Sequence, residues 1–231
     1  MRPCVTALIL AAGAGSRMKL NMTKQKIKLG EESVLRRTVR IFNECDLVSS
    51  IIVVARLDEL DFAKEAVLGL EKVREIVVGG KTRAESAKCG FLAIDTECDF
   101  VAIHDAARCF VTTQMICDVV NDAIKYGAAT ASTRVTDTVK RVDLESNITS
   151  TVNRDELVLI QTPQICKKDW YESALEAADS LGADLTDDNM LLENIGVYPH
   201  CTDTGKNNIK ITTPEDLLYA NFLLNEERRD D

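Results

Sequence analysis

Histidine is scarce in this chain of 231 residues, and none of its eight cysteines stands three positions from another. A zinc site draws on closely spaced cysteines and histidines, so the sequence argues against one. Scattered cysteines, in a chain of this size without a secretory signal, are typical of reduced and mostly buried small side chains. The composition therefore predicts a cytoplasmic protein without structural zinc or a disulfide framework.

Long apolar runs and an excess of basic residues are also lacking. No apolar run approaches the roughly 20 residues that cross a bilayer. The formal net charge is −9, from 28 basic and 37 acidic residues. Broad binding to nucleic acid or to a membrane surface requires a basic face, so neither partner is expected. An anionic substrate is not excluded, because a few cations gathered in a cleft can outweigh the global charge.

The most informative stretch is an apolar strand at residues 5–10 that runs into a turn of small residues. Gly13 and Gly15 let the backbone approach a ligand closely, because no Cβ intervenes. The N–H groups of such a turn form an anion-binding concavity, and Arg17 adds a full positive charge. A second basic cluster follows at Lys24, Lys26 and Lys28. Two cationic groups after a phosphate-type loop predict a nucleoside triphosphate site.

A dinucleotide site and an ordinary strand-to-helix turn are the alternatives for this stretch. The dinucleotide fingerprint G-x-G-x-x-G/A needs Gly or Ala where this chain has Met18, and an acidic residue about 20 positions further on. Glu31 and Glu32 stand near that distance, but in a turn before a helix rather than at a strand end. The sequence therefore favours the triphosphate.

Strand and helix patterns alternate along the chain. Apolar, β-branched runs at residues 7–10, 51–55, 76–78 and 100–103 are each followed by an amphipathic segment, and Ser33 is a candidate N-cap for the first helix. Further helices are expected over 84–94, 115–126, 168–181 and 187–193, then a short strand near 209–211 and a final helix from Pro214. The alternation predicts an α/β fold, with a mostly parallel sheet and helices on both faces.

Ligands bind such sheets at the carboxyl ends of the strands. The glycine loop, the Gly79–Gly80 turn and the His104–Asp105 pair all follow strands, so they are expected at one edge. One stretch breaks the alternation: residues 133–142 and 148–152 are β-rich and flank a polar turn at 143–147. An isolated hairpin is marginal in water, so this one predicts a projecting arm that pairs across a homodimer.

Polar motifs follow one another along the chain in a definite order: GGKTR at 79–83 with Ser86, HDAAR at 104–108, TDTVKR at 136–141, TVNR at 151–154, QTPQ at 161–164 and NIKITTPED at 208–216. Each is weak alone. The ordered series, over about residues 7–220, resembles the 2-C-methyl-D-erythritol 4-phosphate cytidylyltransferases of the non-mevalonate isoprenoid pathway.

The resemblance implies a fold and a reaction. The fold is a single Rossmann-like nucleotidyltransferase domain over residues 1–231, with a dimerisation β-arm at about 133–157. The reaction joins CTP to 2-C-methyl-D-erythritol 4-phosphate, giving 4-diphosphocytidyl-2-C-methyl-D-erythritol and pyrophosphate, with Mg²⁺. Two positions depart from the family pattern, because Thr23 and Cys109 stand where the family usually has proline.

The resemblance also implies roles for single residues. Catalytic roles fall to Arg17, Lys24, Arg154 and Lys210, of which the first two would stabilise charge on the α-phosphate and the leaving pyrophosphate. CTP would be held by Ala11, Ala12, Gly13, Gly80, Thr82 and Ser86. Methylerythritol phosphate would be bound by Asp105, Arg108, Thr138, Thr162 and Lys210, and Arg154 would reach its phosphate from the partner subunit. Asp105 is also the one candidate metal ligand.

The chemistry requires no general base. A phosphomonoester has a second pKa of about 6, so at neutral pH it is mostly dianionic and already nucleophilic. The reaction must overcome repulsion between two polyanions, which calls for cations, a metal ion and alignment. His104 is accordingly expected to be a hydrogen-bonded structural residue.

Other functions stay open on the sequence. A cytidylyltransferase for another polyol phosphate, such as ribitol 5-phosphate, would share most of these motifs, although the HDAAR motif and residues 138–141 favour methylerythritol phosphate. A catalytically inactive nucleotide-binding relative would have no need for both Arg17 and Lys24. A dinucleotide-dependent oxidoreductase would bind NAD(P).

Overall fold

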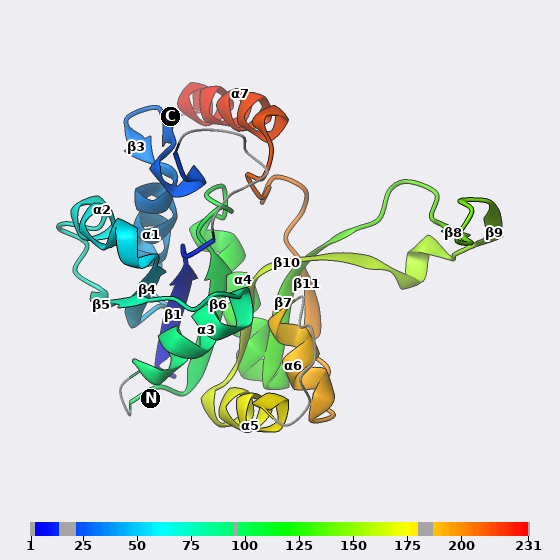
Figure 1. Cartoon of the computed structure of the whole chain (residues 1–231), viewed down its shortest axis with the longest axis horizontal. Coiled ribbons are helices and arrows are strands. Elements are labelled where there is room, and N and C mark those ends of the chain that lie inside the picture. Colours follow the sequence, from blue (N-terminus) through cyan, green and yellow to red (C-terminus); the bar gives the residue numbers. More distant parts are fainter. Residues whose placement is uncertain (1–2, 14–21, 95–96, 180–186, 231) are drawn as a thin grey trace.

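A seven-stranded sheet forms the centre of the protein (Figure 1). The computed structural model describes residues 3–13, 22–94, 97–179 and 187–230. The strand order is β11-β7-β10-β6-β1-β4-β5. The strands are β1 (Val5–Leu10), β4 (Ser50–Ala55), β5 (Val73–Val78), β6 (Phe100–Asp105), β7 (Ala128–Arg134), β10 (Val158–Lys167) and β11 (His200–Asp203). β10 runs antiparallel to β6 and β7, and the other pairs are parallel, so the predicted mostly parallel α/β sheet is confirmed.

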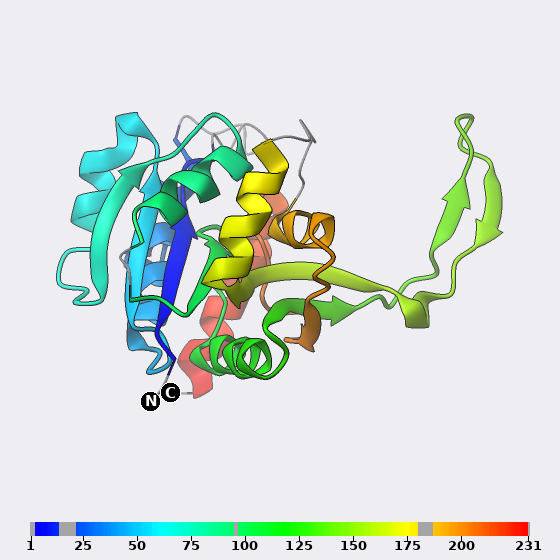
Figure 2. The same ribbon diagram turned by 90° about the horizontal axis from the view of Figure 1, so that it is seen from below.

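Helices cover both faces of this sheet, as the alternation predicts (Figure 2). One face packs against α1 (Val34–Glu44), α2 (Leu60–Ala66) and α4 (Thr113–Tyr126). The other packs against α3 (Arg83–Leu92), α5 (Lys168–Asp179) and α6 (Asp188–Asn194). The final helix, α7 (Pro214–Asp230), begins at the predicted proline and forms a third apolar cluster with Ile27, Leu29 and Phe110. None of the helices in the described ranges combines the length and the apolar character that a bilayer span requires.

Short elements connect the glycine loop to α1 and β4 to α2. They are the 3-10 turn η2 (Lys24–Lys26), the two-stranded ribbon β2 (Lys28–Leu29) and β3 (Glu32–Ser33), and the 3-10 turn η3 (Leu57–Glu59). The ribbon leads directly into α1, whose N-cap is Ser33, as predicted. Its hydroxyl accepts a hydrogen bond from the backbone N–H of Arg36 at 3.2 Å.

Ser33→Ala is expected to lower the free energy of unfolding by about 0.5–2 kcal/mol, because the Arg36 N–H loses its acceptor at the helix end. Urea unfolding measures this change. Ser173→Ala is the matched control, since that exposed hydroxyl lies within α5 and bonds the preceding-turn carbonyl of Asp169. Alanine suits a helix interior, so the control is expected to lose no stability. Equal losses in both variants would contradict the capping role.

A two-stranded arm projects from the body between β7 and β10 (Figures 1 and 2). It consists of β8 (Lys140–Val142), β9 (Ile148–Thr151) and the 3-10 turn η4 (Arg154–Glu156). The predicted hairpin is therefore present, but residues 133–134 belong to β7 and pair with β10 in the main sheet. Val142, Leu144 and Ile148 are exposed apolar side chains on this arm. An arm with exposed apolar side chains fits an element that packs against another chain.

Parts of the predicted element order are wrong. No strand is present at residues 209–211. The segment is a loop whose Ile211 N–H donates to the carbonyl of Ala107 at 2.9 Å, and the Ile211 side chain is buried beneath α7. Ile209 and Ile211 are apolar because they pack against α7, not because they belong to a strand. Conversely, β10, most of β7 and the edge strand β11 belong to the main sheet but were not among the predicted strands, and β11 has the polar sequence HCTD.

None of the eight cysteines forms a disulfide, in agreement with the composition. Cys45, Cys109 and Cys166 are buried in the apolar clusters, which is the role expected of a small hydrophobic side chain. The other five are partly or fully exposed, so the prediction that most of them are buried is wrong.

Candidate active site

A cleft of about 600 Å³ lies at the carboxyl ends of the parallel strands. Ala12 and Gly13 follow β1, the Gly79–Gly80 turn follows β5, and Asp105 ends β6. Lys24, Lys210 and Thr212 line it from other segments of the chain. The sequence placed the three strand-following turns at one edge of the sheet, and the structure confirms that placement.

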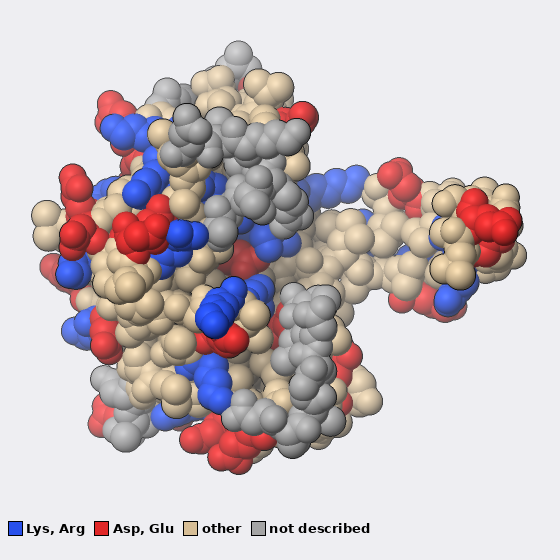
Figure 3. Space-filling view, in the orientation of Figure 1, with Lys and Arg blue, Asp and Glu red and all other residues tan. Residues whose placement is uncertain are grey.

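Cations dominate the lining of the cleft. Among the described residues it carries five of them, Lys24, Arg56, Lys81, Arg83 and Lys210, against the two carboxylates Asp58 and Asp105. The chain as a whole has a net charge of −9. Figure 3 shows basic side chains gathered near the middle of this face, while acidic and basic groups are mixed over the rest. The cleft is therefore a focus of positive potential on an acidic protein, which suits an anionic ligand.

The Gly79–Gly80 turn allows the backbone to pass close to α3. A Cβ on Gly80 would lie 2.3 Å from the Cβ of Glu85, and a Cβ on Gly79 would lie 2.5 Å from that of Ala12. Thr82 and Glu85 form a capping box at the start of α3, and Glu85 also accepts from the Lys81 N–H at 2.6 Å. Glycine is required at both positions because a Cβ would collide with Ala12 or Glu85. The capping box and the contact of Glu85 with the Lys81 N–H hold the turn in place at the wall of the cleft.

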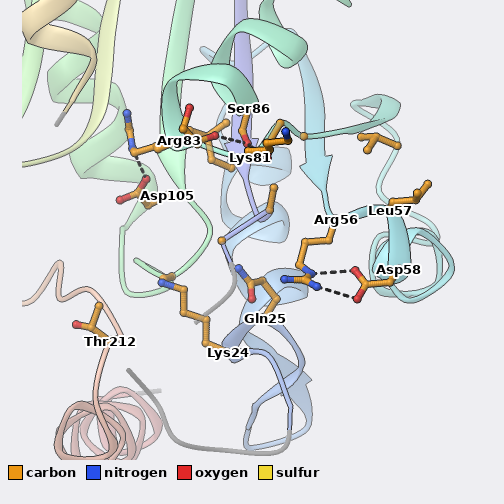
Figure 4. Close-up of a pocket in the computed structure, with 18 of the residues that line it drawn as sticks. Lys24, Gln25, Arg56, Leu57, Asp58, Lys81, Arg83, Ser86, Asp105 and Thr212 are labelled. Atoms are coloured by element: carbon orange, nitrogen blue, oxygen red, sulfur yellow. Dashed lines mark hydrogen bonds and ion pairs between the residues drawn. The ribbon is translucent and has the colours of Figure 1, made fainter. Parts of the chain in front are cut away.

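Asp105 is buried and bound to two cations, of which Figure 4 shows Arg83. Lys210 Nζ lies 2.6 Å from its Oδ2, and Arg83 Nε lies 3.2 Å from its Oδ1. Burial would raise the pKa of this carboxyl, but Arg83 and Lys210 together hold the pKa below its usual value. Asp105 is therefore a carboxylate throughout the physiological range.

His104 lies behind Asp105 and is fully buried. The Thr162 hydroxyl accepts from the Asp105 N–H at 3.1 Å, which leaves its proton for His104 Nδ1 at 3.0 Å. His104 Nε2 then donates to the carbonyl of Arg108 at 3.2 Å. Burial lowers the pKa of His104 to about 3, so the ring is neutral. His104 is hydrogen-bonded on both sides, as expected of a structural histidine.

Arg108 faces a second, smaller hollow at the base of the arm, next to Asn208. Its guanidinium Nη1 donates to the backbone carbonyl of Asn208 at 2.8 Å. Asn208 is itself fully buried and donates to Gln161 Oε1 at 2.9 Å and to the Thr162 carbonyl at 2.8 Å. These contacts connect the loop before Lys210 to β10.

Lys24 reaches the cleft from the turn η2 (Figure 4). Thr23, which stands where proline is usual, is the N-cap of η2, and its hydroxyl donates to Glu59. Glu59 also pairs with Lys26 at 3.3 Å. Two side-chain contacts to one buried carboxylate therefore hold this turn in place of a proline ring. At the other departure, the Cys109 carbonyl accepts from Arg37 Nε at 2.9 Å.

The structure brings together most of the predicted site residues. The cleft is lined by Ala12, Gly13, Lys24, Gly80, Thr82, Ser86, Asp105 and Lys210. Ala11 is buried and donates its N–H to the Val54 carbonyl at 2.7 Å. Thr162 and Arg108 lie behind the lining, and Arg17 falls outside the described residues.

Thr138 and Arg154 are not brought to the cleft of their own chain. Both lie exposed on the arm, where Arg154 Nη1 donates to the Thr136 carbonyl at 2.6 Å. A role for either residue at a cleft therefore requires a second chain.

The donor set at the cleft does not form a metal site of its own. No group of three or more His, Cys, Asp or Glu side chains that could hold an ion occurs among the residues described. Both oxygens of Asp105 are occupied by cationic side chains. Asp105 as a metal ligand is therefore a poor fit, because a cation would have to displace Lys210 or Arg83.

Sequence reasoning missed several lining residues. Arg83 belongs to the GGKTR motif, but the sequence predicted no function for it. An arginine at the first position of a helix that follows a Gly-Gly turn is a signal that could have pointed to it. Arg56 pairs with Asp58 at 2.9 Å in the loop after β4, which carries no motif. Asp188, the second partner of Arg83, lies outside the cleft lining and has no sequence signal at all.

A model of the 2-C-methyl-D-erythritol 4-phosphate cytidylyltransferase family matches residues 5–226. The chain belongs to this family. Relatives of that name include a protein from Clostridioides difficile, 37% identical with 98% of this chain and 96% of the relative covered. Another, from Alkaliphilus oremlandii, is 35% identical with 96% of each chain covered.

Solved structures of the family share the fold. The 4-diphosphocytidyl-2C-methyl-D-erythritol synthase from Anaerococcus prevotii has a TM-score of 0.86 at 30% identity, covering 97% of this chain and all of that one. The Francisella tularensis cytidylyltransferase has a TM-score of 0.78 at 30% identity, with 95% and 99% covered. The nucleotidyltransferase fold implied by the sequence motifs is thus confirmed, and family membership identifies the chain as a nucleotidyltransferase enzyme.

Proposed function

We propose that this protein transfers the cytidylyl group of CTP to 2-C-methyl-D-erythritol 4-phosphate, with release of pyrophosphate, in isoprenoid precursor biosynthesis. The observation that carries the proposal is the cation-lined cleft of a family member, with its Gly-Gly turn and its Asp105–Lys210 pair. The acceptor phosphate oxygen attacks the α-phosphorus of CTP, and the bond to the bridging oxygen of pyrophosphate breaks. No proton has to be removed from the nucleophile, because the phosphate is already dianionic.

Each wall of the cleft would serve one substrate. Ala11, Ala12 and Gly13, with Gly80, Thr82 and Ser86, would hold CTP, largely through backbone and hydroxyl groups. Lys24 and Arg17 would stabilise the negative charge that develops on the α-phosphate and the leaving group. Asp105 would accept a hydroxyl of the acceptor, and Lys210 would bind its phosphate.

The arm would complete the site in a homodimer. Thr138 and Arg154 lie on an element with exposed apolar side chains and away from the cleft of their own chain. An isologous dimer would bring both residues to the partner's cleft, where Arg154 would bind the acceptor phosphate. In this arrangement the arm would pack against the partner subunit and supply residues to its active site.

Mg²⁺ would accompany the nucleotide. This ion keeps several waters and binds mainly through substrate phosphates, so the absence of a carboxylate cluster among the described residues fits a metal that enters with CTP. EDTA in excess over the metal is expected to abolish pyrophosphate release, and added MgCl₂ to restore it. An unchanged rate in EDTA would contradict the proposal for the metal.

Gly80→Ala is expected to raise the KM for CTP and to destabilise the fold by about 1–3 kcal/mol, because the new Cβ overpacks against Glu85. Steady-state kinetics and urea unfolding measure the two effects. A wild-type KM and a wild-type unfolding curve together would show that the turn has room to move.

Pyrophosphate release from CTP with each purified polyol phosphate tests the function directly. Turnover with methylerythritol phosphate and none with ribitol 5-phosphate is expected. Preference for ribitol 5-phosphate would support the alternative cytidylyltransferase, and CTP binding without any turnover would identify an inactive relative. Because the described helices include no membrane span and the motifs are those of a metabolic enzyme, we propose that the reaction takes place in the cytoplasm.

A further inference from the structure

Arg83 stands between two buried carboxylates. Its Nε lies 3.2 Å from Asp105 Oδ1, and its Nη1 lies 2.6 Å from Asp188 Oδ2. Figure 4 shows the side chain extending from the start of α3 to Asp105. Asp188 is 2% exposed and lies at the start of α6, on the side of Arg83 away from the cleft lining. One guanidinium thus connects a cleft residue to a carboxylate in the protein interior.

Asp188 is fixed on every side by the fold. Its Oδ1 accepts from the Tyr171 hydroxyl at 2.7 Å, and its backbone N–H donates to Gln164 Oε1 at 2.9 Å. A buried carboxylate is costly unless it is paired and hydrogen-bonded. Arg83 is the cation in contact with it among the residues described. The need to neutralise Asp188 therefore determines where the guanidinium of Arg83 lies.

The capping of α3 does not explain Arg83. The Thr82–Glu85 box already satisfies the helix start, and Arg83 contributes no contact to it. Burial alone would lower the pKa of the Arg83 guanidinium, but Asp188 and Asp105 raise it above its usual value. The side chain is therefore a permanent cation held by its two carboxylates.

Asp105 has a second cation, Lys210, at 2.6 Å from its other oxygen. Under the proposed function, Lys210 binds the phosphate of the acceptor. A single ammonium has three donors but one positive charge, so a phosphate that binds Lys210 shares the charge that otherwise neutralises Asp105. Asp105 would then lie near a dianionic phosphate, with Arg83 as the cation that it does not share with the phosphate.

We propose that Arg83, anchored by Asp188, is a positioning residue that holds Asp105 in place as a carboxylate while Lys210 also binds the acceptor phosphate. The inference rests on the proposed function and assigns roles to two residues outside its substrate contacts. Asp188 acts through Arg83, and Arg83 acts through Asp105. The effect of both therefore falls on the acceptor and not on CTP.

Asp188→Asn is the central test, because it keeps the shape of the side chain and an acceptor for Tyr171 while removing the charge that anchors Arg83. We expect the KM for methylerythritol phosphate to rise about tenfold, the worth of one charged hydrogen bond. The KM for CTP is expected to stay within about twofold of wild type, because the substitution removes no contact that the proposed function assigns to CTP. A merely structural role would alter both constants together or only the melting temperature.

A double-mutant cycle shows whether Asp188 acts through Arg83. Arg83→Met alone leaves a buried charge without a partner and risks misfolding, whereas Arg83→Met with Asp188→Asn removes both charges. In the Arg83→Met background, adding Asp188→Asn is expected to change the acceptor KM by less than about twofold. If Arg83→Met does not fold, Arg83→Lys replaces it as the background, since lysine keeps the charge but cannot bridge both carboxylates.

Arg40→Met is the matched control. Arg40 also bridges two carboxylates, Glu32 and Glu44, each at 3.0 Å, but it lies on α1 outside the cleft. We expect wild-type values of both KM constants. Equal rises in the two constants for Asp188→Asn, no rise in either, or independent effects in the cycle would each overturn the inference. Absence of turnover in the wild-type enzyme would instead overturn the proposed function, and the inference with it.

Discussion

Replacing Lys24 by alanine is expected to lower kcat by about a hundredfold or more, the cost of about 3–4 kcal/mol seen when one preorganised donor to a developing charge is lost. Lys24 lines the cleft from η2, and the contacts of Thr23 and Lys26 with Glu59 hold that turn in place. The ammonium is therefore in position before the substrate binds. Its charge meets negative charge that increases on the way to the transition state, so kcat falls more than KM rises.

Lys28→Ala is the control for this variant. Lys28 lies four residues further on, is exposed in β2 and is not part of the cleft lining. Steady-state pyrophosphate release is expected to show wild-type kcat for Lys28→Ala and the large loss for Lys24→Ala. A Lys24→Ala enzyme with near-wild-type kcat would remove this residue from the mechanism.

Arg154→Ala is expected to inactivate the enzyme although Arg154 lies on the arm and not at the cleft of its own chain. Under the proposed function, its loss removes a cation from the acceptor phosphate in the partner's site. Mixing Arg154→Ala with Lys24→Ala subunits provides the decisive measurement. In the mixed dimer one site combines an intact Lys24 with an intact Arg154 from the other chain, while the second site lacks both.

Co-expression of the two variants with different affinity tags yields the mixed dimer. Random pairing makes half of the dimers mixed, each with one working site. The unfractionated mixture is therefore expected to have about a quarter of the wild-type activity, although both parent variants are nearly inactive. Arg141→Ala, a change on the exposed β8 strand, is the control and is expected to leave activity unchanged. A mixture as inactive as its parents would show that Arg154 does not act in trans, and the role of the arm would have to be revised.

The elements that sequence predicted best are those with local signals. β1, β4 and β6 are largely apolar, β-branched runs that are buried except at Ser50, and α1 has both an apolar stripe and a capping serine. The turns after these strands then had to meet at one edge, because parallel strands share their carboxyl end. Gly13, Gly80 and Asp105 were therefore placed correctly by topology alone.

Elements stabilised by distant partners were missed. β11 is polar and is a strand because β7 offers it a parallel edge, with register from His200 to Asp203. Ile209 and Ile211 alternate like a strand, yet they pack under α7. In both cases the tertiary environment overrode the local pattern.

The sequence by itself determined the family, the order of the motifs and the residue types that meet a polyphosphate. Only the tertiary structure decided how those charges are paired. Arg83 and Asp188 are 105 positions apart in the sequence. Lys210, which contacts Asp105, lies in a loop that follows β11, the last strand of the sheet in chain order. Motifs record which groups are present near a strand end, whereas the partner of a buried charge depends on which distant side chain the fold brings within hydrogen-bonding distance.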